Sequence, residues 1–389
     1  MKVTGIRTQL YEVDLNRILG DANSPRGRRR NAGLAVFVDT DTELVGVAIG
    51  TPGIDGALRG MFPLIEGQDP RSVRGLWKRM VDAAFKGGTV GVVNDAIAAI
   101  DVALWDLKAK ANDEPLWMTL GALAPRCRAY ASGLDMPLID DELRTYYAGM
   151  AAKGVTAGKL KVGLDQEADL RRLGVMRDAL RGRTPRPELM IDANEFWSPK
   201  QAIRKIRALE EHFDLTWVEE PARRWDYRGL RLVSESVRAA VATGENLDHI
   251  GEFMALLDQR AVDIVQVGSS TTGITGALTV AEMAYGFEVP VSVMNSPGSF
   301  MAHLAAALPN HTMLEVLAAG RDAVFSIDAR LENGWIELGP KPGLGLVFDP
   351  EKLARYRVES VAREAVASPW GRRQGAALYD NPPSEAERG

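Results

Sequence analysis

The feature that most constrains the fold is a repeated alternation of short apolar strands with amphipathic helices. From about Arg128 onward this alternation recurs at intervals of roughly 25 to 30 residues, which is typical of βα units and a parallel sheet. Ser198 and Pro199 form a good helix start after the third strand. The pattern predicts eight strands, at 129–132, 158–162, 189–192, 216–219, 241–245, 264–267, 289–294 and 313–316. Eight βα units predict a (β/α)8 barrel.

The residues before the barrel have a different pattern and predict a separate α+β unit. Alternating residues at about 3–13, 32–38 and 43–49 predict a small antiparallel sheet, and 92–112 has the spacing of a long helix. The segment 16–30 is rich in Gly, Pro, Asn and Arg, so we expect a surface loop there. A chain of 389 residues exceeds the size at which one core stops growing, which agrees with two units.

Composition excludes several classes of function. The formal net charge of -5 and the pI near 5.6 give no electrostatic reason to expect nucleic acid or a membrane as a partner. Cys127 is the only cysteine, so the chain has no internal disulfide and no cysteine-based zinc site. The first residues lack the apolar core of a signal peptide. We therefore expect a cytoplasmic enzyme that acts on a small molecule, and we expect a homo-oligomer.

Three carboxylates follow successive barrel strands. Asp192 ends MIDAN, Glu219 lies in WVEEP and Glu245 in ATGEN, at spacings of 27 and 26 residues. One βα unit separates each pair, so the three side chains should stand together on the rim where the strands end. Adjacent carboxylates repel unless a cation lies between them, and hard oxygen ligands favour Mg²⁺. The sequence predicts one Mg²⁺ ion here, while Glu195 and Glu220 should point away from it.

Two lysines precede the carboxylates by one βα unit. In GKLKVG, Lys159 and Lys161 are two residues apart near the end of a strand, so both face the same side. A lysine beside a metal site and a second ammonium can have its pKa lowered enough to act as a base near neutral pH. The alternative, two solvated lysines on an exposed edge, is disfavoured by their position next to the predicted metal ligands.

Together these motifs resemble the enolase superfamily, and within it the mandelate racemase/muconate lactonizing enzyme-like branch that includes acid-sugar dehydratases. The match covers most of the chain and consists, in order, of AIAAIDVALWDLKAK, PLWMTLG, GKLKVG, MIDAN, WVEEP, ATGEN, GITGA and PGLG. The resemblance implies a modified TIM barrel (residues 128–325) under an N-terminal α+β capping domain (1–127). C-terminal residues (326–389) would complete the cap, and we expect the polar tail, 368–389, to be partly mobile.

The resemblance also assigns roles. Asp192, Glu219 and Glu245 would hold Mg²⁺, Lys161 would be the base or acid on one face of the substrate, and Lys159 would assist near the substrate carboxylate. A proton α to a carboxylate is very weakly acidic, and the dianion left by its removal needs concentrated positive charge, which a metal and two lysines supply.

Two departures from the family pattern bear on the reaction. Many members carry an Asp after the sixth strand and a His after the seventh, where this chain has Gly268 and either Met294 or Asn295. His303 follows about two helical turns later, and we expect it to be a packed helix residue. Two-base racemisation needs groups on both faces, whereas a syn elimination can use Lys161 first as base and then as acid.

Five further residues are candidates for substrate binding: Asn194, Asn295, Glu315, Arg28 and Arg223. Glu315 resembles a family acid that contacts the substrate carboxylate, although a structural role is also open. Arg28 belongs to a cluster of four arginines in the predicted loop, and arginine suits a second carboxylate or a polyhydroxy acid. A solvated basic loop is the alternative. Arg223 follows Glu219 closely at the predicted barrel mouth.

The leading hypothesis is a Mg²⁺-dependent lyase that dehydrates a sugar acid or a related hydroxy acid. One alternative is an epimerase, racemase or cycloisomerase that uses a second group not evident in the sequence. Another is a binding protein that keeps metal and ligand affinity but has no catalytic activity. Gly268 and Asn295, which replace the usual acid and base, would agree with this alternative.

Overall fold

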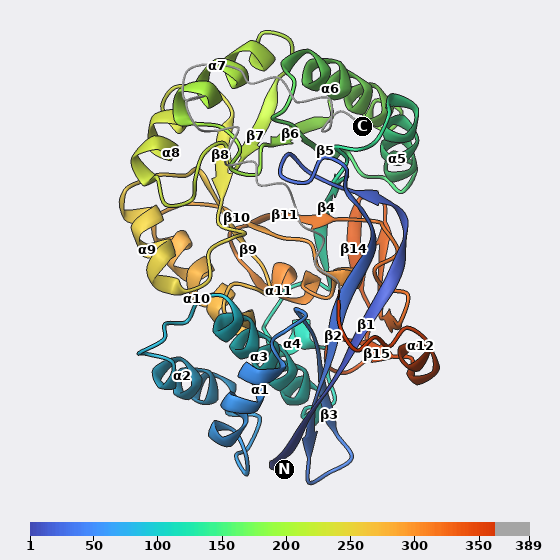
Figure 1. Ribbon diagram of the computed structural model, residues 1–389, viewed down its shortest axis with the longest axis vertical. Helices are drawn as coiled ribbons and strands as arrows, with labels where there is room; N and C mark the ends of the chain where they lie inside the picture. Colours follow the sequence, from blue (N-terminus) through green and yellow to red (C-terminus); the bar gives the residue numbers. More distant parts are fainter. Residues whose placement is uncertain (362–389) are drawn as a thin grey trace.

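Eight parallel strands close into a barrel in the computed structural model, which describes residues 1–361 (Figure 1). The strands pair in chain order, and pairing of the last with the first closes the sheet. They are β4 (Arg126–Ser132), β5 (Ala157–Lys161), β6 (Glu188–Asp192), β7 (Leu215–Glu219), β8 (Ala240–Thr243), β9 (Ile264–Val267), β10 (Val291–Val293) and β11 (His311–Val316). The predicted barrel is thus confirmed, and all eight strands occur within a few residues of the predicted positions.

Helices lie around the outside of the barrel (Figure 1). They are α5 (Asp140–Ala152), α6 (Gln166–Leu180), α7 (Pro199–Glu210), α8 (Tyr227–Ser234), α9 (Ile250–Asp258), α10 (Gly273–Gly286), the 3-10 turn η2 (Pro297–Ser299) and α11 (Ala302–Ala307). The start of α7 is as predicted: the Ser198 side chain accepts from the Gln201 backbone, and Pro199 is the first helical residue.

Apolar side chains fill the barrel below the strand ends. Tyr130, Met190 and Trp217 are buried together there, with the rings of Tyr130 and Trp217 meeting edge to face at 5.2 Å. Met190 and Trp217 each precede an acid by two residues on the same strand, and residues two apart share a face. The barrel interior therefore continues upward from an apolar layer into a layer of charged side chains.

The N-terminal unit is an antiparallel sheet covered by helices. It comprises β1 (Val3–Leu19), β2 (Arg28–Thr40), β3 (Val45–Gly50), α1 (Asp55–Met61), the 3-10 turn η1 (Phe62–Leu64), α2 (Val73–Ala83), α3 (Val92–Ala111) and α4 (Leu116–Thr119). The prediction of a loop over 16–30 was wrong at both ends, because β1 continues to Leu19 and β2 begins at Arg28. Buried Leu19 and a hydrogen bond from the Asn16 amide to the Ala319 carbonyl extend this ribbon across the barrel end.

The chain after the barrel adds short strands and returns to the cap. These elements are β12 (Phe325–Ile327), β13 (Ala329–Glu332), β14 (Trp335–Leu338), β15 (Leu346–Phe348) and α12 (Pro350–Arg355). β14 pairs antiparallel with β4, and Arg357 forms a bridge with Tyr11 of β1. The predicted domain bounds at 127/128 and 325/326 stay predictions, and the tail 368–389 lies outside the described residues. No helix among residues 1–361 is long and apolar enough to cross a membrane.

Candidate functional site

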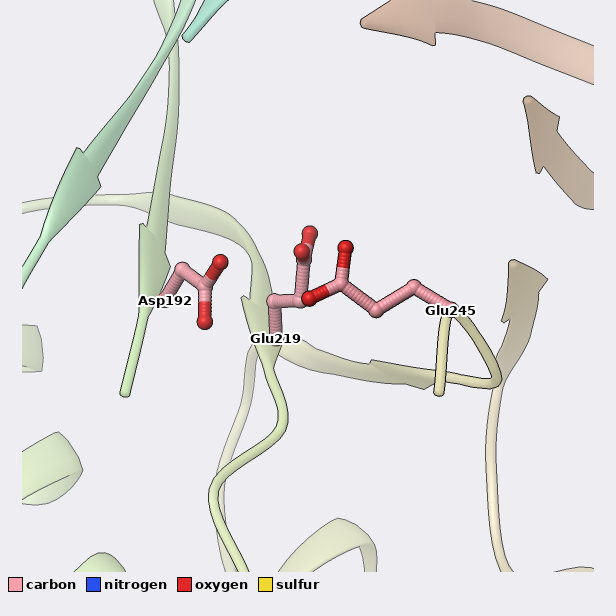
Figure 2. Close-up of side chains that lie close together, drawn as sticks. All are labelled: Asp192, Glu219 and Glu245. Carbon is pink, nitrogen blue, oxygen red and sulfur yellow. The ribbon is translucent and has the colours of Figure 1, made fainter. Parts of the chain in front are cut away.

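The three predicted metal ligands lie together at the strand ends. Asp192 ends β6 and pairs in register with Glu219 at the end of β7, which places their side chains side by side. One ligand oxygen from each of Asp192, Glu219 and Glu245 lies within 4.8 Å of the others. Figure 2 shows the three carboxylates directed toward one another.

Glu245 reaches this cluster through an irregularity at Gly244. Alternation from the inward-facing Ala242 would turn residue 244 inward and Glu245 outward. Gly244 has φ of 132°, and a Cβ there would lie 2.4 Å from the Gln266 carbonyl oxygen. Only glycine fits this close approach, and the change of direction brings Glu245 inward although β8 ends at Thr243.

The electrostatics of the cluster suit a divalent cation. Burial and the negative charge of Asp192 raise the pKa of Glu219 well above its usual range. Burial and the charge of Glu220 do the same to the pKa of Glu245. Asp192 is the exception: burial would raise its pKa, but Lys161 and Lys159 hold it below its usual value. Crowded carboxylate oxygens that resist ionisation fit Mg²⁺, which would neutralise them.

Both lysines of β5 point into the same cluster. Lys159 Nζ lies 2.5 Å from a Glu219 oxygen, 3.0 Å from one of Glu315 and 3.4 Å from one of Asp192. Lys161 Nζ donates to Asp192, its register partner on β6. Burial would lower the pKa of Lys161, but Asp192 outweighs burial and raises it. The expected lowering of this pKa is therefore not found, because the ammonium touches a carboxylate rather than only a second ammonium.

Backbone contacts hold the two lysines in position. The Lys161 amide donates to Asp135 Oδ1 at 3.0 Å, and Arg172 donates to the Lys161 carbonyl at 2.8 Å. The Tyr147 hydroxyl donates to the Lys159 carbonyl at 2.6 Å. The end of β5 is thus fixed from the helix side, which limits how far either ammonium can move.

Asn295 occupies the rim after β10 and is held between two charged side chains. Its Nδ2 donates to Glu315 Oε2 at 2.5 Å, and its Oδ1 accepts from Arg321 Nη2 at 2.7 Å. Glu315 in turn contacts Lys159, and although burial would raise the pKa of Glu315, Lys159 and Lys161 keep it well below its usual value. Asn295 and Glu315 therefore connect Arg321 to the lysines, and no residue of this chain of contacts is a histidine.

The other substrate-binding candidates are divided between the site and its surroundings. The Asn194 amide donates to Asp192 Oδ1 at 2.8 Å, and Asn194 Oδ1 is buried without a hydrogen-bond partner among the described residues. Arg223 Nη1 donates to Glu195 at 3.1 Å, so it already has a carboxylate partner. Arg28 is exposed at the start of β2, and its Nη2 donates to Asn31 Oδ1 at 3.4 Å.

The acids predicted to point away lie outside the cluster of three. Glu195 accepts from Arg223 and, at 2.6 Å, from Arg224. Glu220 accepts from Asn246 at 2.7 Å, and burial together with Asp192 raises the pKa of Glu220 to about 8.

His303 is a packed residue, as predicted. Its side chain is 1% exposed, Nδ1 accepts from the Trp117 amide at 3.1 Å, and Nε2 lies 3.1 Å from the Leu344 carbonyl oxygen. Burial lowers its pKa to about 4. Both ring nitrogens are thus engaged between the cap and the barrel, away from the carboxylates.

Two residues of the site were missed in the sequence. Gln266 Nε2 donates to Glu219 Oε2 at 2.5 Å, and strand alternation backward from Gly268 could have identified it. Arg321 lies in the irregular segment between β11 and β12, where no periodicity indicates which way a side chain points. It also borders a cavity of about 310 Å³ together with Asn16 and Ser296, and none of the three clustered carboxylates lines that cavity.

Family models match most of the two units just described. The model described as "Enolase C-terminal domain-like" matches residues 142–352, and the N-terminal domain model of mandelate racemase / muconate lactonizing enzyme matches residues 36–121. The chain belongs to this family. The predicted membership of the enolase superfamily, in its mandelate racemase-like branch, is therefore confirmed.

Relatives in the family have several activities. The chain is 33% identical to 3,6-anhydro-alpha-L-galactonate cycloisomerase of Streptomyces coelicolor, over 91% of this chain and 99% of the relative. It is 31% identical to L-talarate/galactarate dehydratase of Salmonella typhimurium, over 78% and 75% of the two chains. L-Talarate dehydratase from a Polaromonas species, solved with Mg and L-glucarate, superposes with a TM-score of 0.82 at 27% identity, covering 92% and 98%. Dehydratases, cycloisomerases and epimerases all occur among the relatives.

Proposed function

We propose that this protein is a Mg²⁺-dependent lyase that removes the proton α to the carboxylate of an acid sugar and eliminates the β-hydroxyl group. The observation that carries the proposal is that only one side of the barrel rim has a side chain able to carry a proton. Lys161 provides a proton-carrying side chain at the end of β5, whereas the corresponding positions after β9 and β10 hold Gly268 and Asn295. Elimination from a single face of the substrate needs only one proton-carrying group, which Lys161 would provide.

The chain's carboxylates would hold the metal. Asp192, Glu219 and Glu245 offer oxygen ligands within 4.8 Å of one another, and relatives have been solved with magnesium. Bound there, Mg²⁺ would supply positive charge to the substrate carboxylate and so make its α-proton more acidic.

Lys161 would take the α-proton on its Nζ. The Cα–H electron pair then moves into the carboxylate, the β-hydroxyl leaves with the proton that Lys161 returns to it, and the enol product becomes a 2-keto-3-deoxy acid. Lys161 must begin this step neutral. Because Asp192 is also a proposed metal ligand, a carboxylate engaged by a cation would hold the neighbouring ammonium less strongly.

Lys159 and Glu315 would act together beside the reacting carboxylate. Lys159 is fully buried, which would lower its pKa, but contacts with Glu219, Glu315 and Asp192 raise that pKa well above its usual value and favour the charged form. Its fixed positive charge would stabilise the enolate as negative charge develops. Glu315, itself held by Asn295, fixes the direction of Lys159.

A second candidate is cycloisomerisation, which the 33% identity to a cycloisomerase over 91% of the chain favours. The first step is the same removal of an α-proton by Lys161. The leaving group is then a ring ether oxygen instead of a hydroxyl, so the ring opens and no water is lost. Epimerisation is disfavoured because neither Gly268 nor Asn295 can return a proton from the other face.

A panel of linear and 3,6-anhydro acid sugars, incubated with the protein and Mg²⁺, tests the proposal. We expect a 2-keto-3-deoxy acid from at least one of them, identified by NMR. Water loss from a linear acid indicates dehydration, and ring opening without water loss indicates cycloisomerisation. An α-epimer as the only product, or no reaction with any acid, would contradict the proposal.

A further inference from the structure

Most cations around the site are already matched to carboxylates. Lys159 and Lys161 contact the metal-ligand carboxylates, and Arg223 and Arg224 share Glu195. Arg321 differs, since no carboxylate of residues 1–361 lies within ion-pair distance of its guanidinium group. It is a largely enclosed positive charge at the site that forms no direct ion pair within residues 1–361, although the charges of Glu315 and Asp322 act on it.

The contacts of Arg321 leave part of its donor set unused. Its Nη2 donates to the neutral Asn295 Oδ1 at 2.7 Å. Its Nε is buried and has no hydrogen-bond partner among the described residues. Burial lowers the pKa of Arg321 to about 10, which still leaves it charged near neutral pH. A buried charged donor without an acceptor is costly, and an anionic ligand would remove that cost.

A second arginine lies near enough to interact with Arg321. Arg28 pairs across the ribbon with Leu19, and Leu19 packs against Leu317 and Ala319 just before Arg321. In keeping with this placement, the positive charge of Arg28 lowers the pKa of Arg321. Arg28 comes from the cap strand β2 and Arg321 from the barrel segment after β11. Two like charges brought together from separate parts of the chain form a place for an anion.

The metal cluster has counter-charges of its own. Its carboxylates (Asp192, Glu219, Glu245 and Glu315) lie beside two lysines and would hold one divalent cation. Arg321 and Arg28 make no ion pair with any of these four carboxylates. Arg321 is separated from Lys159 by Asn295 and Glu315, so this charge lies away from the reacting end.

We propose that Arg321, assisted by Arg28, binds a second carboxylate at the far end of the substrate, so that the protein prefers dicarboxylic acid sugars (aldarates) to monocarboxylic ones (aldonates). This specificity rests on the proposed function, because it assumes that an acid sugar is bound at the metal cluster. The planar guanidinium group can donate two parallel hydrogen bonds to a carboxylate, and a hydroxyl at the same place would accept weaker ones.

Binding measured without turnover tests this proposal. Calorimetric titration of the magnesium-loaded Lys161→Ala variant with galactarate and galactonate compares a diacid with its matched monoacid. We expect galactarate to bind at least 10-fold more tightly. Adding Arg321→Gln should weaken galactarate binding about 10- to 100-fold and galactonate binding less than about 3-fold. Arg321→Lys should fall between, because it keeps the charge but loses the paired donors.

Arg30→Gln is the matched control, since Arg30 is another exposed arginine on the same cap strand as Arg28 but already pairs with Glu12. It should change neither affinity, and Arg321→Gln should leave Mg²⁺ affinity unchanged. Equal weakening of both sugars by Arg321→Gln, or no preference for galactarate before it, would overturn the proposal, as would failure of both sugars to bind. If the preference holds but the unsubstituted protein converts no acid sugar to a 2-keto-3-deoxy acid, the proposed function fails and the specificity of the site stands.

Discussion

The rim at β5 and the rim at β10 carry different kinds of side chain. At β5, Lys161 touches Asp192 and can carry a proton. At β10, Asn295 cannot carry a proton and is fixed between Glu315 and Arg321. The difference fits the proposed function, in which one side of the site transfers protons while the other binds and orients the substrate, so that elimination is favoured over epimerisation.

The largest effect is expected from removing the proton carrier. Lys161→Ala should lower kcat for the elimination by about 10²- to 10⁴-fold, because general acid–base catalysis contributes about that much. Product formation measured by NMR checks this, with the exposed Lys200→Ala of α7 as control. A loss of less than about 10-fold would show that Lys161 is not the base, and the two sides of the rim would then not differ in proton transfer.

Removal of a metal ligand should act on Mg²⁺ binding directly. Glu245→Gln keeps the shape of the side chain but not its charge. Outer-shell partners of metal ligands are worth about 10- to 100-fold in affinity, so loss of a ligand should cost about 100-fold or more. Calorimetric titration with Mg²⁺ measures this. Glu235→Gln, at an exposed acid paired with Arg231, should bind Mg²⁺ normally. Equal affinities in the two variants would show that Glu245 is not a ligand.

A smaller effect is expected at the β10 rim. Asn295→Ala removes the hydrogen bond to Glu315 and loosens Lys159, which should lower kcat/KM about 10-fold. Exchange of the α-proton should continue, because Lys161 is untouched. Deuterium NMR measures this exchange. Its complete loss would show that Asn295 takes part in proton transfer, and the two sides of the rim would then not differ in this respect.

His303 should affect stability and not activity. Its pKa is about 4 in the folded chain against about 6.5 when unfolded, so the unfolded chain alone takes up a proton as pH falls through this window. The stability that neutral His303 provides is present above pH 6.5 and is lost toward pH 4, by about 3 kcal/mol in total.

His303→Gln should therefore be destabilising at pH 7, and its difference from the unsubstituted protein should shrink by about 2 kcal/mol at pH 5. Denaturant unfolding at the two pH values measures this, and activity of the folded variant should change less than about 2-fold. A difference that does not vary with pH would contradict the assignment, and a large loss of activity would make His303 the missing second base.

Regular strands made most of the barrel predictable. Asp192 and Glu219 each end a buried apolar strand, and Lys159 and Lys161 lie at strand positions of the same parity, so alternation places all four. Glu245 was expected at the end of its strand, but its inward direction depends on the unusual backbone at Gly244. The ribbon over residues 16–30 was missed because its pairing depends on long-range partners such as Ala319, which local composition does not indicate.

The contacts of Arg321 could not be predicted for a related reason. Its segment is irregular, and its direction is set by where Asn295 lies in the fold, 26 residues earlier in the chain. The pKa of Lys161 was predicted to fall and is instead raised, because the outcome depends on which charged atom its Nζ touches, a detail below the level of sequence spacing. Strand ends were thus predictable, whereas contacts between loops were not.

Proton exchange in deuterated water tests the central claim, that Lys161 takes the α-proton from one face only. The magnesium-loaded protein is incubated with a reactive acid sugar, and the unreacted substrate is recovered and analysed by NMR. We predict deuterium at the α-carbon with the original configuration, and none with Lys161→Ala. Deuterated α-epimer, or exchange that persists in Lys161→Ala, would contradict the account.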